Sequence, residues 1–138
     1  MKNLATCKPS EFIAQTAKIR KSVANWIDVI DIVNIRATNP QYKVIPIDAS
    51  AEEKKMIIEE NAKLQKKQAV ENANKILDNM LAVHPQETLE VMALCCFVEP
   101  SEVDNHPMDE YLQCIMEMVS NKSVMDFFKF LAQLQMQK

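Results

Sequence analysis

The sequence predicts an all-α fold, and three features of the chain lead to that prediction. The 138 residues include no glycine, the residue that supplies positive φ angles in tight hairpins and phosphate-binding loops. Good helix formers such as Ala, Leu, Met, Lys, Gln and Glu are plentiful. Apolar residues recur at spacings of three and four along much of the chain. We therefore expect a small multi-helix bundle of five to six helices, with one long helix over about 50–83 and an extended loop over about 38–49.

Length and charge bound the organisation of the chain. Its length suits one core, so we expect a single all-helical domain over residues 1–138, from which residues 50–70 project as a helical arm. Residues 1–70 carry 12 Lys and Arg against 8 Asp and Glu, whereas residues 71–138 carry 4 against 11. The two halves would attract each other within a monomer or between subunits. The acidic half would repel nucleic acid, so we expect no nucleic-acid partner.

The first helix is expected to begin at about Ser10, which would cap it, and to reach about Arg36. The stretch from Trp26 onward is rich in Val and Ile. It predicts a kink or break near Asn25 or Asp28, where a second helix would begin.

The loop over 38–49 contains Pro40 and Pro46, which hold the residues before them extended. It forms either an irregular loop or a short edge strand, whose pairing Pro46 would limit. Three apolar residues are expected to pin it to the helices: Val44, Ile45 and Ile47.

Ser50 with Glu53 forms a capping box that opens the long helix, which can run without a breaker to Val83, about 50 Å. Its apolar seam is thin and rich in alanine, so its first half is weakly held by its own domain. We expect copies of the chain to associate through this half into a homo-oligomer. The residues expected at that contact are Met56, Ile57, Ile58 and Leu64.

Three shorter helices are expected after His84-Pro85: residues 86–98, a helix opened by residues 105–107, and a helix capped by Ser123 with Asp126. Residues 91–98 are eight apolar residues in a row. Such a segment must be buried on every side, either in a helical core or under a partner. The core face expected for the middle helix consists of Met108, Tyr111, Leu112, Ile115 and Val119.

No group of side chains predicts catalysis or a bound cofactor. His84, His106 and the cysteines (Cys7, Cys95, Cys96, Cys114) lack the spacings of zinc sites. The carboxylates of residues 99–110 lack the glycine-containing calcium loop and indicate a solvated loop. No apolar run approaches the roughly 20 residues of a membrane span. We expect a soluble, cytoplasmic protein that is not an enzyme and binds neither metal nor membrane.

Methionine and phenylalanine gather in the C-terminal half, where seven of the nine methionines lie between Met80 and Met136. Met is flexible and suits surfaces that bind varied apolar helices, although a small core also uses it as filler. The residues expected to bind a partner are Leu89, Met92, Phe97, Met116, Met125, Phe127, Phe128, Phe130 and Leu131.

The stretch Cys7-Lys8-Pro9-Ser10-Glu11-Phe12, followed by Ile19-Arg20-Lys21-Ser22-Val23 and Trp26, resembles the start of small all-α tail assembly chaperones from prophages of Gram-positive bacteria. Size, helix layout and the acidic, Met- and Phe-rich C-terminal half are also similar over most of the chain. The resemblance implies a non-enzymatic protein that coats the long, helical tape measure protein while the tail tube assembles. In that family a longer, frameshifted form often contacts the tail tube protein. The family has no residue-level motif to carry over.

The alternative function is a small helical adaptor or regulatory protein of a mobile element. A DNA-binding form of this alternative is less favoured, because a recognition helix needs exposed basic or amide side chains on one face. The segment containing Lys18, Arg20 and Lys21 is the only contender.

Overall fold

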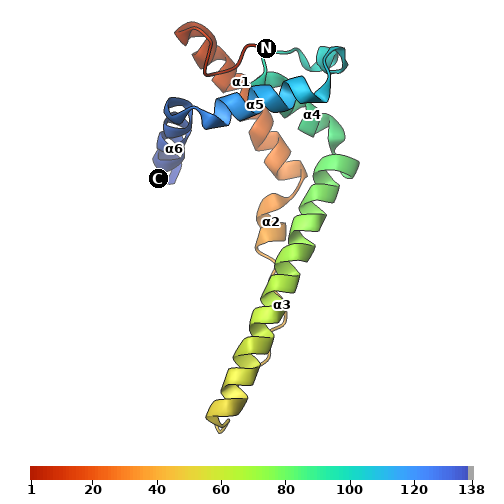
Figure 1. The fold of residues 1–138 in the computed structure, drawn as a ribbon, viewed down its shortest axis with the longest axis vertical. Coiled ribbons are helices and arrows are strands. Elements are labelled where there is room, and N and C mark those ends of the chain that lie inside the picture. The colour runs from red at the N-terminus through yellow and green to blue at the C-terminus, as the bar shows by residue number, and fades with distance from the viewer. Residues whose placement is uncertain (137–138) are drawn as a thin grey trace. The chain divides into compact units, whose positions relative to one another are not determined.

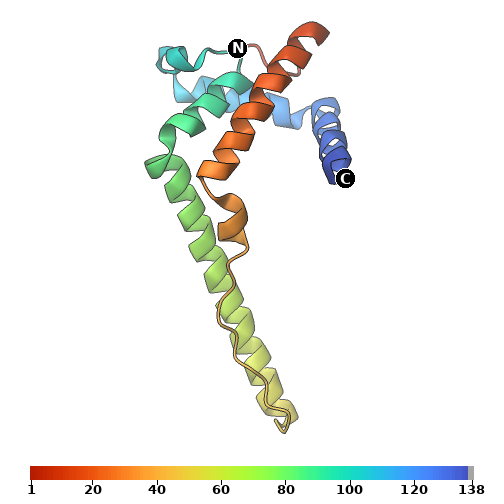
Figure 2. The same ribbon diagram turned by 180° about the vertical axis from the view of Figure 1, so that it is seen from behind.

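The computed structural model describes residues 1–136, and the chain is all-helical, as its composition predicted (Figures 1 and 2). No strand occurs within the described residues. The α-helices are α1 (Pro9–Val29), α2 (Ile32–Arg36), α3 (Ala51–Asp78), α4 (Pro85–Cys95), α5 (Met108–Ser120) and α6 (Lys122–Met136). A π-helical turn, η1 (Asn79–Val83), continues α3, and a 3-10 helix, η2 (Pro100–Asn105), precedes α5.

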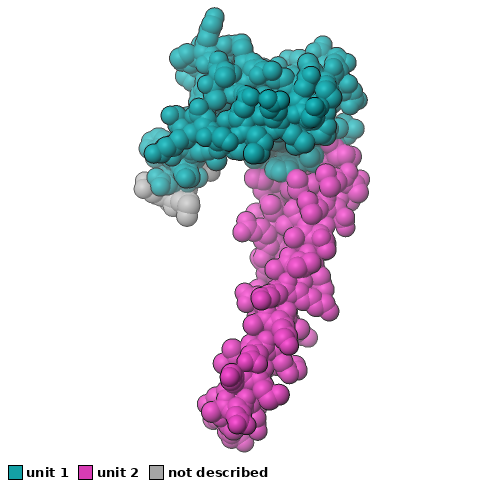
Figure 3. Space-filling model, in the orientation of Figure 1, with its two compact units in different colours: residues 1–26, 86–138 teal, residues 27–85 magenta. Residues whose placement is uncertain are grey.

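The chain divides into two compact units (Figure 3). The core unit comprises Met1–Trp26 and Gln86–Lys138, and the α2–α3 unit comprises Ile27–Pro85. Each unit is described below by itself.

The core unit is built around one apolar cluster, to which the run 91–98 contributes. Ala93, Cys95 and Cys96 are buried, and none of the eight residues of the run is exposed. Two side-chain hydrogen bonds join α1 to α4: Gln15 Nε2 donates to the Leu94 carbonyl (2.6 Å) and Trp26 Nε1 donates to Thr88 Oγ1 (2.9 Å). The buried members of the cluster are Leu4, Ile19, Cys95, Cys96, Tyr111, Cys114, Met118 and Val124.

The helix caps follow the sequence prediction at one position and depart from it at two. The Glu53 N–H donates to Ser50 Oγ (3.2 Å), which confirms the predicted cap of α3. Ser10 does not cap α1, because the helix begins at Pro9 and Glu11 Oε1 instead accepts from the Lys8 N–H (3.1 Å). Ser123 does not cap α6 either. Asn121 Oδ1 accepts from the Val124 N–H (3.0 Å), so the helix begins at Lys122.

The break after the first helix lies later than predicted. The helix α1 passes unbroken through Asn25 and Asp28 and ends at Val29. Ile30 is fully buried, and Asp31 adopts a left-handed conformation (φ 58°), which Asp tolerates better than most residues. The chain therefore turns at the first position where a buried apolar residue is followed by one that accepts positive φ.

Helix α4 ends at Cys95, three residues before its predicted end at Val98. The Val98 N–H donates to the Ala93 carbonyl (3.0 Å) and the Phe97 N–H to the Leu94 carbonyl (3.3 Å). This is the Schellman arrangement, whose left-handed residue is usually glycine. Phe97 occupies that position with φ 57°, in a chain that has no glycine.

In the α2–α3 unit the segment between α2 and α3 runs beside α3 along its length (Figures 1 and 2). Asn61 Oδ1 accepts from the Lys43 N–H (2.8 Å), and Asn61 Nδ2 donates to the Lys43 carbonyl (3.1 Å). Asn72 and Asn79 donate in the same way to the carbonyls of Thr38 (3.1 Å) and Ile30 (2.9 Å). Eleven and seven residues separate these asparagines, which places all three on one face of the helix.

The amides of Asn61 and Asn72 hold the segment, and the predicted pinning by Val44, Ile45 and Ile47 is wrong. All three side chains are exposed, Val44 to 85% and Ile47 completely. The hydrogen bonds direct the backbone edge toward α3, so the side chains of an extended chain stand to either side of that direction. No residue of α3 is fully buried.

Candidate partner-binding surface

Helix α5 is apolar on two adjacent faces, and the face that it buries differs from the predicted one. Tyr111, Cys114 and Met118, spaced by three and four residues, are buried in the core. Of the residues predicted to form the core face, Tyr111 is buried as predicted and Ile115 is half-buried. Three other members of that predicted face are exposed: Met108, Leu112 and Val119.

The exposed apolar face of α5, called here the α5 face, consists of Met108 (52% exposed), Leu112 (55%), Met116 (63%) and Val119 (43%). Spacings of four, four and three residues place them within about a quarter of the helix circumference. The helix carries Asp109, Glu110 and Glu117 and no basic residue. The α5 face is thus an apolar strip on an acidic helix.

Helix α6 presents a second exposed strip, the α6 face, made of Phe127, Phe130 and Leu134 at spacings of three and four. The Phe127 ring makes edge-to-face contacts with Phe12 (5.2 Å between centroids) and Phe128 (6.1 Å). Phe127 is therefore held in place while more than a third of it remains exposed.

The residues predicted to bind a partner are distributed between surface and core. Three are exposed and lie on the two faces: Met116, Phe127 and Phe130. Three pack against the core cluster: Met92, Phe97 and Phe128. Three are half-buried: Leu89, Met125 and Leu131. Their role in binding stays a prediction.

Sequence reasoning did not propose Met108, Leu112, Val119 or Leu134 as surface residues, since each fits an apolar stripe with core spacing. The signal that could have raised the question is the excess of apolar residues on α5 over what one buried face can hold. Of the predicted self-association residues in the α2–α3 unit, Met56 and Ile58 are exposed and Ile57 and Leu64 are half-buried.

The thiols of Cys95 and Cys96 are held in the neutral form by burial. Burial raises the pKa of Cys95 from 9.0 to about 11. Burial, followed by a hydrogen bond with Cys114, raises the pKa of Cys96 well above its usual range. Both thiols are neutral near pH 7, whereas a nucleophilic or metal-binding cysteine acts as the thiolate.

His106 forms a local contact with a carboxylate of α5. His106 Nδ1 lies 2.9 Å from Glu110 Oε2, one turn along the chain, and its ring packs edge-to-face on Tyr111. Among residues 1–136, no group of three or more His, Cys, Asp or Glu side chains is arranged to hold a metal ion.

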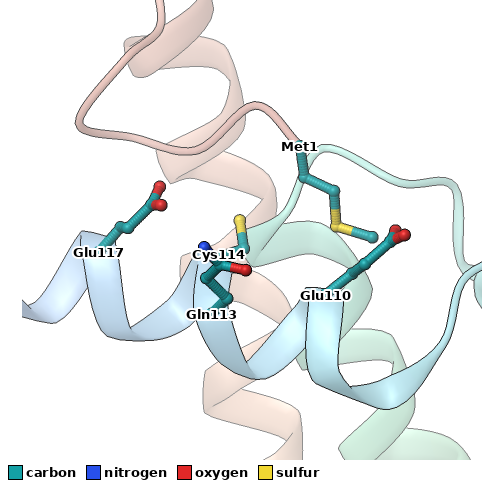
Figure 4. A pocket seen from close by; sticks show the side chains of 5 residues that line it. All are labelled: Met1, Glu110, Gln113, Cys114 and Glu117. Atoms are coloured by element: carbon teal, nitrogen blue, oxygen red, sulfur yellow. The ribbon is translucent and has the colours of Figure 1, made fainter.

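In the part of the core unit that the structure describes, hollows lie at two places of note. One, of about 140 Å³, is lined by Met1, Glu110, Gln113, Cys114 and Glu117, with the two carboxylates at either side of Cys114 (Figure 4). It is smaller than the roughly 300–1,000 Å³ of most small-molecule sites. The other lies between α1 and α4, and its walls mix Lys18 and Lys21 with Glu90.

No family model, curated protein or solved structure matches the chain. Within the described part of the chain, the helices lack the combination of length and apolar character that a membrane crossing requires.

Proposed function

We propose that this chain is a non-enzymatic phage tail assembly chaperone, which binds and shields helical segments of a tape measure protein during tail assembly. The observation that carries the proposal is the presence of exposed apolar strips on two consecutive helices, the α5 face and the α6 face. Contiguous apolar surface of this kind is typical of protein-binding sites.

The chemistry of the two faces indicates what the client offers. A helix that lays apolar residues at i, i+3, i+4 and i+7 into these strips would bury both partners. Because α5 has three acidic and no basic side chains, a client helix with basic residues beside its apolar stripe fits best. Met108 and Met116 can adapt their shape to successive client segments of different sequence.

Several copies of the chain would bind along one extended client, so that weak single contacts add through multivalency. Contact of a longer, frameshifted form with the tail tube protein, homo-oligomerisation, and action in the cytoplasm of a bacterial host belong to the same proposal.

The test is co-expression with the tape measure protein encoded downstream, with the soluble fraction of that protein as the readout. The double substitution Leu112→Asp with Met116→Asp places two charges on the α5 face and should reduce the soluble fraction severalfold. The matched control, Gln113→Asp with Ser120→Asp, adds the same charges to exposed polar positions of the same helix and should act like wild type. The chaperone proposal fails if the tape measure protein is equally soluble without this chain.

A helical adaptor or regulatory protein of a mobile element remains the alternative function. Its DNA-binding form would rely on Lys18, Arg20 and Lys21. Glu90 opposes phosphate binding in the hollow that Lys18 and Lys21 line. Duplex binding at about 0.1 M salt that is lost when these three residues are substituted would favour this alternative.

A further inference from the structure

In the extended segment beside α3, one backbone edge forms hydrogen bonds to α3 and the opposite edge has no backbone partner within the described residues. Both the N–H and the C=O of Lys43 bond to Asn61. In an extended chain, the backbone groups of successive residues point to opposite sides. The N–H and C=O groups of Tyr42 and Val44 therefore point away from α3, and neither residue forms a hydrogen bond to other backbone within the described residues.

This free edge is short and apolar. Tyr42 is 44% exposed and Val44 is 85% exposed. Pro40 and Pro46, which lack an N–H, limit the stretch that can pair to residues 41–45. An open strand edge with β-branched and aromatic side chains is a ready template for another strand.

We propose that two copies of this chain pair through residues 41–45, as antiparallel strands related by a two-fold axis at Lys43. In this register Tyr42 of each copy exchanges two main-chain hydrogen bonds with the partner's Val44, giving four bonds. Residues 42 and 44 share one face of the strand, so Tyr42 and Val44 of both copies form one cluster of cross-strand pairs. The contact is isologous and closes after two copies.

The charge distribution on α3 favours a second copy as the occupant. Asn61 of α3 lies beside Lys43, so the two-fold axis passes at the level of Asn61 in both copies. Residues 51–60 of α3 in one copy therefore lie at the same height as residues 62–71 of α3 in the other copy. The first stretch has four acidic and two basic side chains, and the second has three basic and one acidic. Each Lys43 that meets its counterpart at the axis already forms an ion pair with its own Glu60. A helical client offers no strand for this edge. The pairing supplies a contact for the homo-oligomerisation included in the proposed function, and the two tests that follow measure self-association separately from client binding.

The first test is the mass of the full chain by sedimentation and light scattering over a range of concentrations. We expect a monomer–dimer equilibrium that weakens as salt rises. Val44→Pro removes the outward N–H and should raise the dimer dissociation constant at least about tenfold. The matched control, Ile45→Pro, removes an N–H that points toward α3 and should leave the constant within about twofold, with both variants retaining the wild-type helix content by circular dichroism. A wild type that stays monomeric at low salt, or a dimer indifferent to Val44→Pro, overturns the proposal.

The second test fixes the register by cross-linking. In the proposed pair, two residues at position 43 face each other with Cβ atoms about 5 Å apart, whereas two residues at position 47 lie roughly 27 Å apart along the strands. Mild oxidation should therefore cross-link Lys43→Cys and leave Ile47→Cys at the wild-type background. Equal cross-linking of the two variants, or none in either, overturns the two-fold register.

Discussion

Single residues in this chain take positions that other proteins give to glycine. Phe97 holds the left-handed position at the end of α4, where its Cβ costs roughly 1 kcal/mol. Its ring offsets that cost by packing against the core cluster, and Lys2 Nζ lies 5.8 Å from the ring centroid.

Comparing two substitutions at Phe97 separates backbone strain from ring packing. Phe97→Ala and Phe97→Gly both delete the ring, but only glycine relieves the left-handed strain. We expect both variants to be less stable than wild type, with the glycine variant more stable than the alanine variant by about 1 kcal/mol in urea unfolding. Alanine equal to or better than glycine would contradict the assigned strain.

The raised pKa of Cys95 predicts that the folded protein becomes less stable at alkaline pH. Its folded pKa of about 11 lies above the ordinary value of 9.0, so the thiol contributes its full stability below pH 9. As pH rises from 9 to 11, unfolded molecules lose this proton while folded ones retain it, and the unfolding free energy falls by about 1.4 kcal/mol per pH unit for one thiol. Urea titrations at pH 9 and near pH 11 measure this decline. The Cys95→Ala variant should show a shallower one, and an unchanged slope would argue against a neutral buried thiol.

At the scale of elements, the sequence predicts which helices exist better than which face each buries. The predicted cap at Ser50 is correct although Asp48 lies two residues before it, whereas at Ser123 the side chain of Asn121, also two residues before, forms the cap instead. Capping preference does not rank two such residues, because Ser, Asn and Asp are all favoured at this position. On α5 both Leu112 and Met118 belong to apolar stripes of helical spacing. Periodicity cannot rank two stripes on one helix, since that choice depends on the packing of α1 and α4. For the same reason only part of the candidate surface could be predicted.

The two faces of α5 should respond differently to the same charge. Met118→Asp buries a carboxylate among apolar side chains and should cost several kcal/mol or prevent folding. Leu112→Asp lies on the exposed face and should change the unfolding free energy by no more than about 0.5 kcal/mol. Thermal unfolding of the two variants measures the difference. Similar losses would mean that the α5 face is covered within the folded chain.

The asparagines of α3 control the extended segment. Asn61→Ala removes both hydrogen bonds to Lys43 and should free the segment, which speeds tryptic cleavage after Lys43 by severalfold. Asn74→Ala, at an exposed position of the same helix, serves as the control and should leave the rate unchanged. Equal rates in the two variants would show that other contacts hold the segment.

At the scale of the whole molecule, the two units differ in what holds them. The core unit has a buried cluster of eight residues drawn from its helices and N-terminal segment. The α2–α3 unit buries Ile30 and Ile35 and is otherwise held by side-chain amides bonded to backbone, and its long helix has no fully buried residue. A helix without a buried face gains little from tertiary packing, which supplies most helical stability in proteins. The pattern of apolar residues predicted the thin seam of this helix. A single sequence could not reveal the asparagine contacts, which join residues 18 to 49 positions apart.

Amide hydrogen exchange should therefore separate the two units. We expect the amides of α4 and α5 to exchange only on global unfolding, and those of the N-terminal half of α3 to exchange through local opening at a lower free energy. Raising the protein concentration should slow exchange at Tyr42 and Val44, whose N–H groups pair only in the dimer, and leave Thr38 unchanged as an internal reference, because its N–H already bonds to the Ile35 carbonyl (3.1 Å). Uniform protection across both units would indicate one cooperative structure.

Protection at Tyr42 and Val44 that does not depend on protein concentration would place their hydrogen-bond partners within the monomer, because a dimer contact must strengthen as copies become more abundant.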